Sequence, residues 1–123
     1  MYKFTSMKGN NLEKGKKGEL IAEKFLIEKG FIILEKNWRF KHYEIDLIAK
    51  EGNTTVFIEV KTRNDTSLGF PEEAISKGKI KSVLAGAEEY LYKNPNLDIR
   101  FDVISILLNA TPPDIFHIKD AFY

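Results

Sequence analysis

The stretch from Thr55 to Lys61, which reads TVFIEVK, constrains the fold of this chain more than any other feature. Its first half is apolar at successive positions, as expected for a strand in the middle of a sheet. Its second half carries Glu59 and Lys61, which share one face because side chains alternate along a strand. Their Cα atoms lie about 7 Å apart, so the two charged groups can converge on one ligand. We therefore expect a central strand with a polar site near its end.

Hydrophobic periodicity along the chain predicts two helices and five strands. The helices are expected over residues 12–29 and 80–93, and the strands over residues 31–39, 44–49, 55–61, 99–108 and 115–118. The third strand, the second helix and the fourth strand form a βαβ unit, which implies a right-handed crossover and a parallel pair of strands. The predicted fold class is therefore α/β, in αβββαββ order, with a central mixed sheet flanked by helices.

Length and composition narrow the class of protein. A chain of 123 residues can form one domain with its own core, and we expect residues 1–11 to be a flexible leader and residues 12–123 to be that domain. The chain has no cysteine, which excludes disulfides, thiolate metal sites and a cysteine nucleophile. No apolar run approaches the roughly 18 residues of a membrane span, and the N-terminus lacks the apolar core of a signal peptide. We expect a cytoplasmic protein that does not enter the membrane.

The hairpin between the second and third strands decides where the acidic residues lie. Its apolar residues match when one face carries Ile45, Leu47 and Ala49 together with Val56, Ile58 and Val60. That register places Asp46 across from Glu59 or Phe57, with the two carboxylates roughly 5 to 8 Å apart on one face. Such carboxylates repel each other, and either a raised pKa or a divalent cation relieves the repulsion. Oxygen ligands without His or Cys suit Mg²⁺ or Mn²⁺.

Glu19 in the first helix is a third candidate acid. At 100° per residue it lies about 90° from the centre of the apolar stripe, on the flank of the helix, from which it can lean toward Asp46 and Glu59. The competing interpretation is structural. Glu59 and Lys61 would then be a salt-bridged pair at the end of the sheet, and Asp46 an ordinary strand-end acid.

Basic residues near these acids are candidate contacts for phosphate groups. Lys16 and Lys17 lie in the first helix, Lys79 lies at the start of the second, and Arg63 follows the acidic strand. Such charges are more often simply solvated, and Arg63 has Asp65 as an alternative partner. The formal net charge of +1 does not by itself indicate a protein that binds nucleic acid.

Taken together, these residues resemble the PD-(D/E)XK nuclease superfamily, which has the restriction-endonuclease-like fold. The matching segments are Gly18-Glu19, Glu44-Ile45-Asp46-Leu47-Ile48 and Phe57-Ile58-Glu59-Val60-Lys61-Thr62-Arg63. More closely, the chain resembles the YraN family of small bacterial endonuclease-like proteins, from about Lys14 to Phe122. The chain departs from the usual family pattern at Tyr43, where Gly is common, and at Ile80, where Gln is often found.

The resemblance implies a catalytic set of Glu19, Asp46, Glu59 and Lys61. The three acids would bind Mg²⁺ or Mn²⁺, and the lysine would assist the nucleophile. The implied activity is a metal-dependent endonuclease that hydrolyses DNA phosphodiester bonds, with branched or junction DNA as candidate substrates and a homodimer as a candidate assembly. The alternative is a nucleic-acid-binding module that keeps the nuclease-like fold without cutting, and action on RNA ranks below both.

Overall fold

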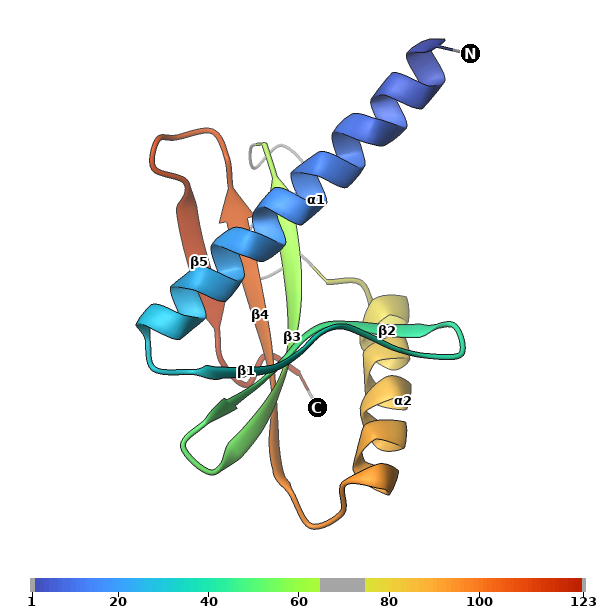
Figure 1. Cartoon of the computed structure of the whole chain (residues 1–123), viewed down its shortest axis with the longest axis vertical. Helices are drawn as coiled ribbons and strands as arrows, with labels where there is room; N and C mark the ends of the chain where they lie inside the picture. The colour runs from blue at the N-terminus through green and yellow to red at the C-terminus, as the bar shows by residue number, and fades with distance from the viewer. Residues whose placement is uncertain (1, 65–74, 123) are drawn as a thin grey trace.

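The structure is a computed structural model that describes the backbone of residues 2–64 and 75–122, with side chains from residue 13 onward. Its elements follow the predicted αβββαββ order (Figure 1). They are α1 (Tyr2–Glu28), β1 (Ile32–Phe40), β2 (Tyr43–Glu51), β3 (Thr54–Arg63), α2 (Lys77–Lys93), β4 (Asp98–Leu107) and β5 (Asp114–Ile118). Residues 65–74, between β3 and α2, lie outside the described residues.

The five strands form one sheet in the order β1-β2-β3-β4-β5. β3 and β4 run parallel, from Thr54 opposite Asp98 to Arg63 opposite Leu107, and the other neighbouring pairs are antiparallel. The parallel strands are joined through α2, which confirms the predicted βαβ unit. β3 is therefore the central strand of a mixed sheet, and its apolar first half is covered on both faces.

The two helices cover opposite faces of the sheet (Figure 1). Ala22 and Leu26 of α1 pack in one buried cluster with Ile58. Val83 of α2 packs in a second buried cluster with Phe57. Phe57 and Ile58 are consecutive in β3, so their side chains point to opposite faces, and each helix buries one of those faces.

The first helix begins earlier than its sequence pattern indicates. It starts at Tyr2 instead of residue 12, because the intervening stretch contains no proline and its one glycine, Gly9, costs a helix only about 1 kcal/mol. The flexibility of residues 1–11 stays a prediction, since their side chains lie outside the described part. None of the described helices is both long enough and apolar enough to cross a membrane.

β2 changes its packing halfway along its length. Leu47 pairs with Ile58 and belongs to the cluster under α1, whereas Ile45 packs with Ile48 in the cluster under α2. The expectation that Ile45 shares the face of Leu47 is therefore wrong. The physical reason is that β2 pairs with β3 only from Leu47 to Glu51. The part of β2 before Leu47 bends away from β3 and pairs with β1 alone (Figure 1). Asp46 is the residue at which β2 leaves the central strand.

A buried ion-pair network joins β4, β5 and the end of the chain. Asp102 is fully buried and accepts hydrogen bonds from Nε of Arg100 at 2.8 Å and from the backbone N–H of Asp120 at 3.1 Å. Nε2 of His117 lies 2.8 Å from the same carboxylate. Asp102 therefore has a structural role, since these contacts hold β5 and the C-terminal residues against β4.

Candidate functional site

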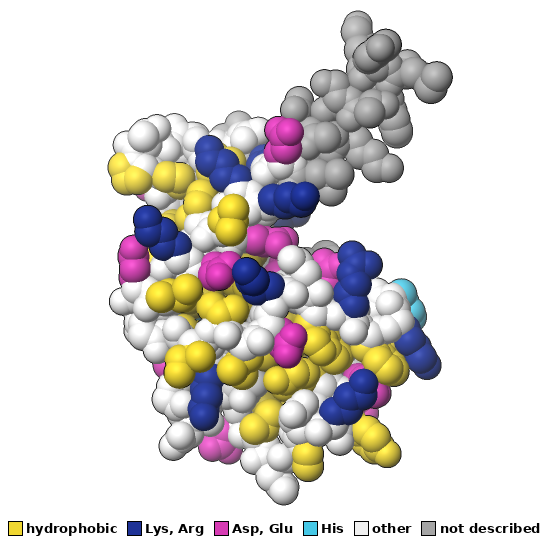
Figure 2. All heavy atoms as spheres, in the orientation of Figure 1, with side chains coloured by type: hydrophobic (Ala, Val, Ile, Leu, Met, Phe, Trp, Pro, Cys, Tyr) yellow, Lys and Arg dark blue, Asp and Glu magenta, His cyan; other side chains and the backbone are white. Residues whose placement is uncertain are grey.

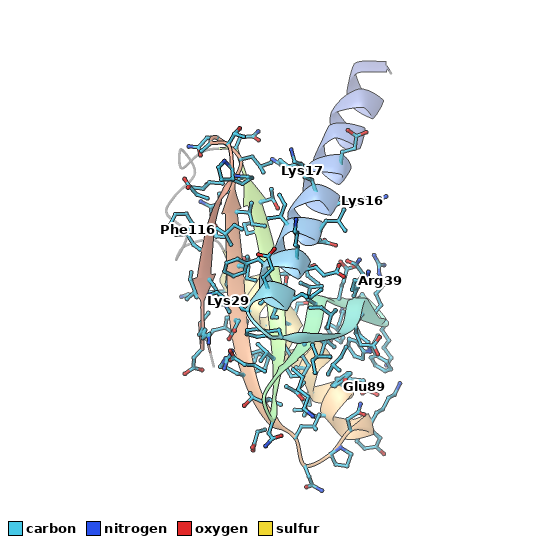
Figure 3. The ribbon with its side chains drawn as sticks, turned by 60° about the vertical axis from the view of Figure 1, so that its left-hand side comes forward. Lys16, Lys17, Lys29, Arg39, Glu89 and Phe116 are labelled. Carbon is cyan, nitrogen blue, oxygen red and sulfur yellow. The ribbon has the colours of Figure 1, made fainter. Side chains whose placement is uncertain are left out.

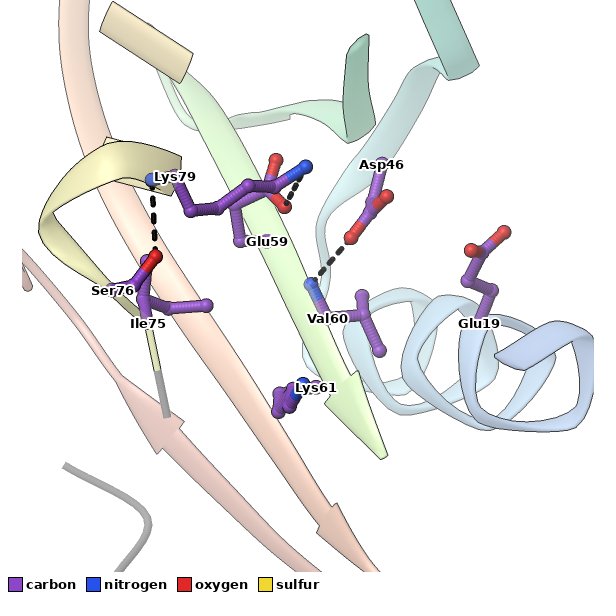
Figure 4. Close-up of a pocket in the computed structure, with 8 residues that line it drawn as sticks. All are labelled: Glu19, Asp46, Glu59, Val60, Lys61, Ile75, Ser76 and Lys79. Carbon is purple, nitrogen blue, oxygen red and sulfur yellow. Dashed lines mark hydrogen bonds and ion pairs between the residues drawn. The ribbon is translucent and has the colours of Figure 1, made fainter. Parts of the chain in front are cut away.

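One pocket brings the four predicted site residues together at the point where β2 leaves β3 (Figure 4). The pocket has a volume of about 410 Å³ and also receives the start of α2. It is lined by Glu19, Asp46, Glu59, Val60, Lys61, Ile75, Ser76 and Lys79. Side chains from α1, β2, β3 and α2 therefore meet in one place, although they are far apart in the sequence.

Asp46 is held in the pocket by the central strand itself. The backbone N–H of Val60 donates a hydrogen bond to Oδ2 of Asp46, with 2.9 Å between nitrogen and oxygen. The pairing of β2 with β3 has ended at Leu47, so β2 no longer offers Val60 a backbone acceptor. A buried amide without an acceptor is costly, and the carboxylate takes the place of the missing strand. The bend of β2 and the position of Asp46 therefore depend on each other.

Glu59 is the most deeply buried acid of the pocket, with 1% of its surface exposed. Its Oε2 lies 3.5 Å from Nζ of Lys79, and its Oε1 has no hydrogen-bond partner. The register that pairs Leu47 with Ile58 brings Asp46 next to Glu59, as predicted. A buried carboxylate oxygen that lacks a partner is rare, and it indicates a site that a ligand can complete.

The pKa values of both acids are raised. Burial, and then the charge of Asp46, raise the pKa of Glu59 to about 9, although the ammonium of Lys79 acts in the opposite direction. Burial also raises the pKa of Asp46, while the hydrogen bond from Val60 lowers it. The acid pair therefore holds a proton more tightly than an isolated carboxylate does, and the ammonium of Lys79 lies beside the charge that remains. Paired carboxylates with shifted pKa values inside a pocket are typical of functional sites.

Glu19 reaches the pocket because α1 passes unusually close to β3. Gly18 lies against the side chain of Thr62, and the space there admits no Cβ atom. The close approach brings the half-buried carboxylate of Glu19 to the pocket wall, where burial and then the charge of Asp46 raise its pKa. A hydrogen bond with the side chain of Asn37 lowers that pKa.

The arrangement fits a divalent cation through two carboxylates. Within the described residues, no group of three His, Cys, Asp or Glu side chains stands close enough to hold a metal ion. Asp46 and Glu59 are nevertheless adjacent, and the unpartnered oxygen of Glu59 is a ready ligand. Mg²⁺ is commonly bound by one or two carboxylates with water completing its shell. Glu19 lines the same pocket, and its place in the metal shell stays a prediction.

The basic residues that are candidate phosphate contacts differ in their exposure to solvent. Lys61 is exposed at the pocket, and Lys16 and Lys17 are exposed on α1 (Figure 3). Arg63 is 8% exposed at the end of β3, so the structure does not present it on the surface as a phosphate contact would require. Its alternative partner, Asp65, lies outside the described residues. On the face drawn in Figure 2, basic and acidic side chains are interspersed and form no single basic patch.

The sequence did not predict several features of the pocket and its surroundings. Lys79 was expected to reach a phosphate, but its contact with Glu59 was not foreseen. The side chain of Ser76 accepts a hydrogen bond from the backbone N–H of Lys79 and so caps α2, a role that a serine before a helix commonly has. Asn37 has a positive φ of 50°, a conformation that asparagine adopts more readily than most residues.

The two departures from the family pattern lie near the pocket without lining it. Tyr43 opens β2 and packs against α2, where a Cβ atom at Gly86 would lie 3.4 Å from the Cβ atom of Tyr43. Ile80 is half-buried in the first turn of α2. Ile80 therefore occupies a position beside Lys79 without offering a polar group to the pocket.

The element order and the five-stranded mixed sheet are those of a restriction-endonuclease-like domain. Sequence comparison gives the family, because the model of "Uncharacterised protein family UPF0102" matches residues 18–106. A UPF0102 protein of Clostridioides difficile is 45% identical over 115 residues, covering 92% of this chain and 99% of its own length. A UPF0102 protein of Phocaeicola vulgatus is 42% identical over 112 residues, covering 90% and 93%. The chain belongs to the UPF0102 family, the YraN family that its motifs resemble.

Proposed function

We propose that this protein is a metal-dependent endonuclease that hydrolyses phosphodiester bonds in DNA. The observation that carries the proposal is the buried Glu59, whose unpartnered oxygen stands beside Asp46 in an open pocket. A carboxylate pair without Cys or His is the ligand type that Mg²⁺ and Mn²⁺ prefer. Lys61 and Lys79 line the same pocket, so positive charge is available for a phosphate group.

In this proposal each side chain has a separate task. Asp46 and Glu59 hold the cation, and Glu19 approaches from α1 to complete its shell. When bound, Mg²⁺ or Mn²⁺ polarises the phosphate and lowers the pKa of a coordinated water. Lys61 is exposed at the pocket, where its ammonium can bind the scissile phosphate and orient the attacking water. The hydrogen bond from the backbone N–H of Val60 keeps the carboxylate of Asp46 in position for cation binding.

The surface charge favours a substrate that is recognised by its structure. Strong non-specific binding to duplex DNA requires several phosphate contacts from a basic surface. The chain has a net charge of +1, and the face drawn in Figure 2 mixes both signs of charge. Branched or junction DNA, which offers phosphates in an arrangement that a regular duplex lacks, is therefore the proposed substrate class.

Cleavage of branched, flapped, single-stranded and duplex DNA with Mg²⁺ or Mn²⁺ tests the proposal. We expect cutting by the wild type and its loss in Glu59→Gln and Lys61→Met. The matched controls are Glu88→Gln and Lys81→Met, which make the same changes at exposed positions of α2 outside the pocket, and they should cut like the wild type. Wild-type protein that cuts none of these substrates with either metal would overturn the proposal.

A second candidate function is a nucleic-acid-binding module that does not cut. The observation that favours it is the contact between Lys79 and Glu59, because an ammonium already neutralises part of the acid pair. Under this alternative, branched DNA binds equally well with and without a divalent cation. Binding that survives Glu59→Gln, with no cleavage in any condition, would support it.

A further inference from the structure

We infer that Lys79 is a built-in counter-cation, which occupies the carboxylate pair in the metal-free protein and is released by the divalent cation to bind the substrate phosphate. The inference rests on the proposed function and adds a means by which metal binding prepares the site for substrate. It starts from the ion pair that links Lys79 of α2 to Glu59 of β3.

The contact joins a buried carboxylate to a lysine that remains partly in solvent. Nζ of Lys79 lies 3.5 Å from Oε2 of Glu59, and the side chains are 40% and 2% exposed, respectively. Lys79 extends from α2 to the carboxylate, as Figure 4 shows, and part of its side chain stays in solvent. Its way out is also toward solvent, so it can leave without any rearrangement of the core.

The backbone of Lys79 does not need to move for this exchange. Its N–H donates a hydrogen bond to the side chain of Ser76, the N-cap of α2, at 3.2 Å. The cap holds the first turn of the helix at the pocket, where Ser76 itself is a lining residue. Motion is therefore confined to the four-carbon stem of the lysine, which rotates freely on its exposed side.

Lys61 provides an internal comparison, because it is a second lysine in the same pocket. It is exposed, and in the described part of the chain no ion pair joins it to Asp46 or Glu59. The opposing charge that acts on both acids is that of Lys79. The two lysines therefore have different roles, and only Lys79 competes with a cation for the acids.

A divalent cation and the ammonium would be close neighbours on the acid pair. The ammonium contacts Oε2 of Glu59 and the cation would take the unpartnered Oε1, and two cations at such a short separation repel each other strongly in a partly buried site. The divalent ion has the larger charge, so it displaces the lysine. The released ammonium stays tethered to the first turn of α2 and lies at the mouth of the pocket, where a phosphate bound to the metal would be within its reach.

The reactivity of each lysine toward an amine-acylating reagent, read by mass spectrometry, tests the exchange in the full-length protein. An ion pair with one partner partly in solvent protects that partner by up to roughly fivefold, the ratio that corresponds to its usual strength. We expect labelling of Lys79 to rise several-fold when Mn²⁺ is added to the wild type. Labelling of Lys61 should not change. Glu59→Gln without metal should show the raised labelling of Lys79 from the start, with no further response to Mn²⁺.

Binding of Mn²⁺, followed in the same samples by electron paramagnetic resonance, separates the two proposals. If Mn²⁺ binds and labelling of Lys79 changes by less than about twofold, the exchange is overturned while the nuclease proposal stands. An equal rise at Lys61 would also overturn it, because the effect would then not depend on the ion pair. If no Mn²⁺ binds the wild type at millimolar concentration, both proposals fail. Circular dichroism of Glu59→Gln verifies that the variant folds, and the comparison of wild type with and without Mn²⁺ needs no variant.

Discussion

Replacement of Glu59 with glutamine should stabilise the metal-free protein at neutral pH. In the folded state burial and the charge of Asp46 raise the pKa of Glu59 from 4.5 to about 9. An acid with a raised pKa holds its proton in the folded state and releases it on unfolding, so stability is full below pH 4.5 and falls as the pH rises toward 9. Glutamine has nearly the same shape and carries no ionisable proton, so it avoids this loss.

The magnitude follows from the interval between the unfolded pKa and the working pH. At pH 7 that interval is 2.5 units from the ordinary value of 4.5, and at 1.36 kcal/mol per unit the loss in the wild type is about 3 kcal/mol. A buried amide that is only partly hydrogen-bonded costs about 1–2 kcal/mol in return. We therefore expect Glu59→Gln to be about 2 kcal/mol more stable than the wild type at pH 7 in EDTA.

Urea unfolding between pH 5 and pH 8 in EDTA measures this difference. Trp38, the only tryptophan, packs against Tyr90 beside the cluster under α2 and can report unfolding by fluorescence. The difference between variant and wild type should grow with pH by about 1.4 kcal/mol per unit, because the titrating groups distant from Glu59 behave alike in both proteins. Glu88→Gln serves as the control and should show no such trend. A difference that is flat between pH 5 and pH 8 would refute the reasoning.

Three further predictions follow from the same structure. At a Mn²⁺ concentration 100 times its Kd, thermal denaturation should show the wild type stabilised by about 2.7 kcal/mol and Glu59→Gln unchanged; equal stabilisation of both would place the metal elsewhere. Gly18→Ala should cost about 1–3 kcal/mol in urea unfolding because the new methyl meets Thr62, and Thr62→Ala should recover part of that loss; additive effects would contradict the contact. Asp102→Ala should cost about 3–5 kcal/mol, since it removes the buried acceptor that Arg100, His117 and the backbone N–H of Asp120 share. Burial alone would raise the pKa of Asp102, but hydrogen bonds from His117 and Arg100 hold it at about 2. The wild type should therefore lose about 2 kcal/mol as pH falls from 4 to 2, and Asp102→Ala should not.

The order of elements could be predicted because each one has a local signal. Alternating and helical apolar patterns are visible within a few residues, and the apolar first half of β3 identifies a central strand without reference to the rest of the chain. The start of α1 was misjudged because residues 2–11 lack the apolar stripe that identifies the rest of the helix. A helix that extends without an apolar stripe has no hydrophobic periodicity by which the sequence could reveal it.

The acid pair was predicted because the register of a hairpin is set by its apolar residues. Leu47 and Ile58 pair as expected, and Asp46 and Glu59 follow from that pairing. The prediction of the side of the sheet that Ile45 faces was wrong, since the bend of β2 depends on packing against α2 and β1. No residue at the bend marks it in the sequence.

The sequence by itself determined the αβββαββ order, the parallel β3–β4 pair and the candidate acids, because these depend on periodicity and on neighbours along the chain or across one hairpin. The tertiary structure decided which lysine meets the acids. It places Lys79 against Glu59 and leaves Lys61 in solvent, although Lys61 is only two residues from Glu59 in the sequence. It also decided the approach of Glu19, through the contact of Gly18 with Thr62. Such contacts join elements that are distant in the chain, and the packing of the helices on the sheet alone brings them together.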